Sequence, residues 1–119
     1  MNEIKLRIPA KAENVLAIRL FISGLAARCG FDIHKIEDIK TAISESCVLL
    51  LSRSEGGELL ISVDTAETFM IVLNKAGAVP REPDAEYIPE FSRMLLEGLA
   101  EVAKITEVDG DCIAVKLVF

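Results

Sequence analysis

The residue best suited to acid–base chemistry in this sequence is Glu45, within the run Ile36–Leu51. Apolar residues recur through that run at steps of three and four, which predicts one face of an α-helix. They are Ile36, Ile39, Ile43, Cys47 and Leu50. Glu45 lies nine residues after the first of them, so at about 100° per residue it points roughly opposite the apolar stripe. It therefore faces either solvent, as helix-surface glutamates mostly do, or a cleft in which it could be catalytic.

The other nucleophilic or ligating residue types form no recognisable motif. The serines beside Glu45 have no histidine near them in the sequence, and Cys47 fits the apolar stripe, which indicates packing rather than nucleophilic chemistry. The single histidine, His34, stands near the start of the expected helix and is interpreted as a surface residue. Gly56-Gly57 indicates a turn, because the sequence has neither of the common phosphate-binding glycine motifs.

Composition and charge restrict the class of protein. The chain has 119 residues, of which 51% are hydrophobic, and we assign residues 1–119 to a single domain. With 13 basic and 19 acidic residues its net charge is −6, which argues against a general affinity for nucleic acid or an anionic membrane. Three widely spaced cysteines and one histidine predict no metal site and no disulfide framework, and reduced thiols favour an intracellular, cytoplasmic protein. We find no apolar run typical of a signal peptide or a membrane span.

Patterning over the rest of the chain predicts the elements that would position Glu45. Alternating apolar residues predict strands over residues 4–8, 58–64, 68–74, 105–108 and 112–119. Helical spacing predicts helices over residues 13–29, 36–51 and 91–103. An α+β fold follows from this order. We expect a two-layer α/β sandwich, with a mostly antiparallel sheet and three helices on one face.

Particular residues refine these elements. Asp32 is expected to cap the central helix, and Asp109-Gly110 is a strong signal for a two-residue hairpin turn. The run 48–51 is apolar all round, so that end of the central helix is expected to be buried on more than one side. Residues 76–89 contain three prolines and are expected to form a loop or flap. The last helix is expected to turn four apolar residues toward the core, namely Met94, Leu95, Leu99 and Val102.

Residues 8–47 resemble the N-terminal half of the bacterial anti-sigma-factor serine kinases. The best signature is the stretch 39–47, IKTAISESC, which is similar to a helix of that family. Residues 95–119 resemble the family's last helix and closing hairpin, and the order of elements agrees over nearly all of the chain. The resemblance implies the histidine-kinase-like ATPase fold (the GHKL or Bergerat fold), which these kinases share with Hsp90 and gyrase.

The resemblance also implies roles for individual residues. In that family the glutamate matching Glu45 acts as a base, and an asparagine four residues later helps to hold Mg²⁺ under the ATP phosphates. Leu49 stands at that second position here, and a leucine offers no oxygen ligand to Mg²⁺. Asn74 matches an aspartate that recognises the adenine amino group in that family. Gly77, with a one-residue shift, matches a glycine that lets the backbone approach the nucleotide. The family's phosphate-capping glycines are replaced by residues 87–94.

Three hypotheses about function follow. The main one is a degenerate, kinase-like anti-sigma protein that uses no cofactor and acts by binding a sigma factor or a small antagonist domain. The alternative is an active serine protein kinase that uses ATP and Mg²⁺ with altered ligands to phosphorylate an anti-anti-sigma partner. The third is an unrelated interaction domain that shares the fold, because a fold does not determine a function.

The sequence also predicts self-association through the strand at residues 4–8. A strand at the start of the chain is expected at a sheet edge, where free N–H and C=O groups can pair with another strand. The resembling kinases form homodimers, which points the same way. Lys5 and Arg7, in contrast, would discourage such pairing.

Overall fold

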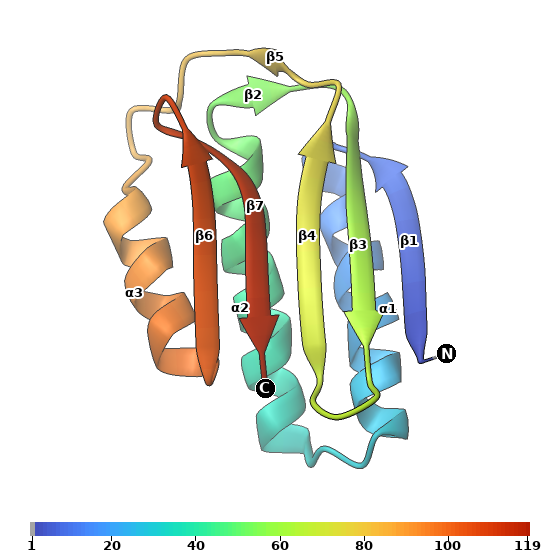
Figure 1. Ribbon diagram of the computed structural model, residues 1–119. Coiled ribbons are helices and arrows are strands. Elements are labelled where there is room, and N and C mark those ends of the chain that lie inside the picture. The colour runs from blue at the N-terminus through green and yellow to red at the C-terminus, as the bar shows by residue number, and fades with distance from the viewer. Residues whose placement is uncertain (1) are drawn as a thin grey trace.

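The computed structural model describes residues 2–119, and within them three α-helices pack on one face of a five-stranded sheet (Figure 1). The strands of this sheet are β1 (Glu3–Pro9), β3 (Glu58–Asp64), β4 (Met70–Ala76), β6 (Val102–Val108) and β7 (Asp111–Val118). The helices are α1 (Val15–Arg28), α2 (Ile33–Leu51) and α3 (Pro89–Leu99), and a 3-10 turn, η1 (Ala12–Asn14), precedes α1. Two short strands, β2 (Ser54–Glu55) and β5 (Val79–Pro80), pair with each other.

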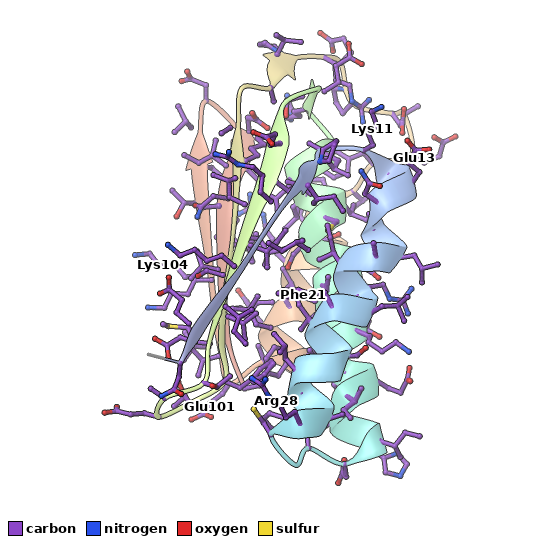
Figure 2. The ribbon with its side chains drawn as sticks, turned by 90° about the vertical axis from the view of Figure 1, so that its right-hand side faces the viewer. Lys11, Glu13, Phe21, Arg28, Glu101 and Lys104 are labelled. Carbon is purple, nitrogen blue, oxygen red and sulfur yellow. The ribbon has the colours of Figure 1, made fainter. Side chains whose placement is uncertain are left out.

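The strand order is β1-β3-β4-β7-β6, and each neighbouring pair is antiparallel. The predicted α+β class is therefore confirmed, and the arrangement is consistent with the histidine-kinase-like ATPase fold. β1 lies at an edge of the sheet, as expected, whereas its pairing with a second chain stays a prediction. Seen along the sheet, the helices lie on one side and Lys104 of β6 points to the other (Figure 2). In residues 2–119 we find no helix with the length and apolar character needed to cross a membrane.

The core lies between the sheet and the helix layer. α2 contributes the predicted apolar stripe, because Ile39, Ile43, Cys47 and Leu50 are all buried. Asp32 caps this helix as expected, and its Oδ1 accepts a hydrogen bond of 2.8 Å from the backbone N–H of Lys35. From the strands, the alternate inward residues Leu59, Ile61, Val63, Ile71 and Leu73 complete the centre of the core.

Two details of α2 differ from the prediction. The helix begins at Ile33, one turn earlier than expected, directly after the cap. Val48 was expected to be buried and is 46% exposed, because it lies on the side of α2 that faces away from the sheet. The predicted burial on more than one side therefore holds for Leu49 and Leu50 but not for Val48.

The prediction for the last helix was wrong in its length and in the orientation of Met94 and Leu95, whereas Leu99 packs against the core as expected. α3 ends at Leu99, because Ala100 has an extended backbone conformation (φ −100°, ψ 153°). Val102 consequently belongs to β6. Met94 and Leu95 are 61% and 42% exposed, and the buried positions of α3 are held instead by Ser92 and Leu96.

The segment expected to be a loop contains a close backbone crossing. β4 continues to Ala76, and β5 then pairs with β2 at the end of α2 (Figure 1). Gly57 lies at this crossing with φ +70°, a value that side-chain-bearing residues rarely adopt. A Cβ atom there would be 2.6 Å from the backbone nitrogen of Ala78 and closer still to the carbonyl oxygen of Ala76. The crossing therefore requires glycine at position 57.

Candidate functional site

Glu45 is half-buried and points at α3 rather than at open solvent. The Ser92 hydroxyl donates a hydrogen bond to Glu45 Oε2 over 2.8 Å, so one carboxylate oxygen is already engaged within the protein. Because this contact joins residues 47 positions apart, it depends on the packing of α2 against α3. The structure thus places Glu45 at the boundary between α2 and α3, which is neither of the two surroundings that the sequence left open.

Leu49 lies one helical turn beyond Glu45 and is 1% exposed. It belongs to the main hydrophobic core, which confirms that this position is filled by packed apolar atoms. Mg²⁺ requires near-octahedral oxygen ligands, and a buried leucine supplies none. Among residues 2–119 no group of three or more His, Cys, Asp or Glu side chains converges as a metal site would require.

The structure does not bring Asn74 together with Glu45. Successive side chains of a strand point to opposite faces, and Ile71 and Leu73 of β4 point toward the helices. Asn74 is therefore exposed on the outer face of the sheet, where it lines a shallow hollow shared with residues of β1 and β3. Gly77 follows β4 with φ +75° and packs against Gly57 at the backbone crossing.

The inward position at the end of β4 belongs to Lys75, which our sequence reasoning missed. Its side chain is 5% exposed, and its ammonium group donates to Asp111 Oδ1 and Ser54 Oγ, both at 2.6 Å, and to the Leu50 carbonyl at 2.8 Å. Three donors thus meet three acceptors, so the buried cation is fully hydrogen-bonded. This Lys75 cluster ties β4 to β7 and to the last turn of α2, whose carbonyls favour a cation.

Lys75→Met is expected to lower the free energy of unfolding by about 2 kcal/mol, because it leaves Asp111 and Ser54 without their cationic donor. The loss stays below that of a fully buried ion pair because Asp111 is 28% exposed and is partly solvated. Urea denaturation measures it. Lys104→Met, at an exposed position on the outer face of the sheet, should change stability by less than about 0.5 kcal/mol. Equal losses in the two variants would contradict a structural role for the cluster.

A pocket of about 320 Å³ lies against α2 but does not include Glu45, Asn74 or Gly77. The start of α1, the C-terminal half of α2 and residues 81–87 form its walls. Cys47 lines it, and burial raises the pKa of this thiol to about 12. Since the thiolate is the nucleophilic form, Cys47 is chemically quiet at neutral pH, in line with its predicted packing role.

Comparison with known proteins gives a partial match. No protein-family model matches the chain. Over 63 residues, half of this chain, the sequence is 45% identical to the serine-protein kinase RsbW of Bacillus thuringiensis (strain Al Hakam) and to proteins of the same name from Bacillus cereus strains B4264 and AH187. The match covers 39% of each relative, so the chain spans well under half the length of the relatives it matches. This similarity supports the resemblance to the anti-sigma-factor serine kinases.

Proposed function

We propose that this chain is an anti-sigma type of regulatory protein that acts by binding another protein and does not use Mg-ATP. The observation that carries the proposal is Leu49, which is 1% exposed at the position where the resembling kinases hold Mg²⁺. Phosphoryl transfer depends on positioning the phosphates and neutralising their charge. A packed apolar side chain does neither.

The placement of the other candidate residues supports the same proposal. Glu45 lies on the helix side of the sheet and Asn74 on the opposite side, so one nucleotide could not contact both. The inward place near the end of β4 is taken by Lys75, whose donors are all used within the protein. The partner we propose, from the similarity to RsbW, is a sigma factor or a small antagonist domain in the cytoplasm.

The test is calorimetric titration with ATP and Mg²⁺, for which we expect no binding at micromolar concentrations. Thermal melting gives a second readout, since a ligand at 100 times its Kd adds about 2.7 kcal/mol of stability. The serine-protein kinase RsbW from Bacillus cereus is the positive control. Saturable micromolar binding by this chain would overturn the proposal.

Such binding would favour an active, ATP-dependent serine protein kinase that phosphorylates an anti-anti-sigma partner. The observation on its side is the retained Glu45, which the Ser92 hydroxyl orients. Purified sigma factor and antagonist domain, each mixed with the chain without nucleotide, separate the two functions further. We expect the chain to bind its partner in these mixtures without ATP.

A further inference from the structure

The outer side of α3 carries large apolar side chains that the chain itself leaves uncovered. Phe91, Met94 and Leu95 are 57%, 61% and 42% exposed, and Ile88, just before the helix, is 48% exposed. We call these four residues the α3 face. Met94 and Leu95 lie three and four residues after Phe91, so the three share one side of the helix. An amphipathic helix ordinarily turns such a stripe toward the core.

Specific contacts hold α3 in this orientation. Ser92 is buried and donates to Glu45 on α2, and Leu96, one turn later, is fully buried in the core. On another side of the helix, Arg93 pairs with Glu107 of β6. Contacts to α2, the core and β6 together determine the rotation of the helix, so the outward apolar stripe is part of the folded arrangement.

The segment of the chain that carries the α3 face is strongly acidic and exposed. Residues 82–101 contain six acidic side chains, all exposed, and one basic side chain. The acidic residues are Glu82, Asp84, Glu86, Glu90, Glu97 and Glu101. The single basic residue, Arg93, is paired with Glu107, and Asp84 is paired with Arg81, which directly precedes this segment. This segment of twenty residues therefore has a net charge of −5, in a chain whose total is −6.

We infer that the α3 face is the docking surface for a basic amphipathic helix of the partner protein. Apolar residues of such a helix would cover Phe91, Met94 and Leu95, and its lysines or arginines would lie against the acidic residues around them. Uncovered apolar surface of this kind marks interaction sites, and a methionine adapts to the shape of its partner. A second copy of the chain would bring like charges together, so charge favours a basic partner over self-association. The inference rests on the proposed function and specifies the chemistry of the partner.

The experiment uses a synthetic helical peptide of about 18 residues, with leucines on one side and lysines on the other. Fluorescence anisotropy with the full chain should show saturable binding. Raising the ionic strength from about 0.1 M to 1 M, which shortens the Debye length from about 10 Å to 3 Å, should weaken it. A peptide with glutamate in place of lysine should not bind.

Variants locate the contact. Phe91→Ser should weaken peptide binding by about thirtyfold, the size of a hot-spot loss. Leu20→Ser is the matched control, because Leu20 on α1 is 60% exposed and lies outside the α3 face. The double change Glu86→Gln and Glu90→Gln should weaken binding and reduce its dependence on salt. Phe91→Ser and Leu20→Ser should both keep the melting temperature of the unsubstituted protein within a few degrees.

Three results would overturn the inference. They are no binding of the lysine peptide, equal weakening by Phe91→Ser and Leu20→Ser, or a dimer in light scattering that Phe91→Ser disrupts, which would make a second copy the occupant. Failure here is distinct from failure of the proposed function. If the chain binds a purified sigma factor or antagonist and Phe91→Ser leaves that affinity unchanged, the docking surface alone is wrong. If Mg-ATP binds while the peptide docks as described, the proposed function alone is wrong.

Discussion

Leu49→Asn is expected to lower the free energy of unfolding by about 4 kcal/mol. The substitution removes a buried leucine side chain, a change that costs about 2–5 kcal/mol in cores, and it places a polar amide in the hydrophobic core. Leu49 is 1% exposed and part of the main core, so the amide could not reach water without displacing its neighbours. Urea denaturation, followed by circular dichroism, measures the change.

Val48→Asn is the control for the Leu49 substitution. Val48 is the preceding residue on α2 and is 46% exposed, so an amide there remains hydrated. We expect it to cost less than about 1 kcal/mol. If Leu49→Asn proved neutral and the variant bound Mg-ATP, the position would be an open ligand site rather than core, and the proposed function would fail with it.

Gly57→Ala should destabilise the protein by about 3 kcal/mol or more, through strain in the backbone. The added Cβ would lie 2.6 Å from the nitrogen of Ala78 and still closer to the carbonyl of Ala76, and neither is a flexible side chain that can move aside. The positive φ of +70° adds about 1–2 kcal/mol for any L-residue with a Cβ. The melting temperature reports the combined effect.

The neighbouring glycine separates crowding from backbone conformation. Gly56 has φ +75°, and a Cβ there would meet no atom within 4 Å. Gly56→Ala should therefore show only the conformational part of the loss, about 1–2 kcal/mol. Equal melting temperatures for the two variants would mean that the crossing at Gly57 relaxes easily.

The central helix and the strand pattern could be predicted because each depends on local spacing. The α2 stripe and the inward residues of β3 and β4 follow from periods of 3.6 and two, and the Asp32 cap follows from its residue type just before the helix. The same reasoning failed for Met94 and Leu95 of α3, which the pattern turned toward the core and the structure leaves exposed. The orientation of α3 depends on contacts between distant segments, among them a hydrogen bond from Ser92 to a residue 47 positions earlier, and no local pattern contains them.

In the candidate site, too, some features could be predicted from the sequence and others could not. Burial of Leu49 follows from the apolar run around it, and the structure confirms it. Asn74 was assigned by resemblance, although the alternation of β4 places it on the face opposite Leu73. The same alternation puts Lys75 inward, so a period-two signal for Lys75 was present in the sequence. Its partners Ser54 and Asp111 come from distant segments, and these could not be predicted from spacing.

The strand order also determines when the parts of the sheet can assemble during synthesis. β1 pairs with β3, so Glu3 lies opposite Asp64 and Pro9 opposite Glu58. In a nascent chain that is made in this order, the backbone edge of β1 stays unpaired until α1, α2 and the whole of β3 have left the ribosome. During that interval the N–H and C=O groups of β1 have no strand to pair with, and unpaired apolar strands are prone to aggregation. Packing of α1 against α2, which needs only neighbouring sequence, can begin earlier and offers β1 its first apolar surface.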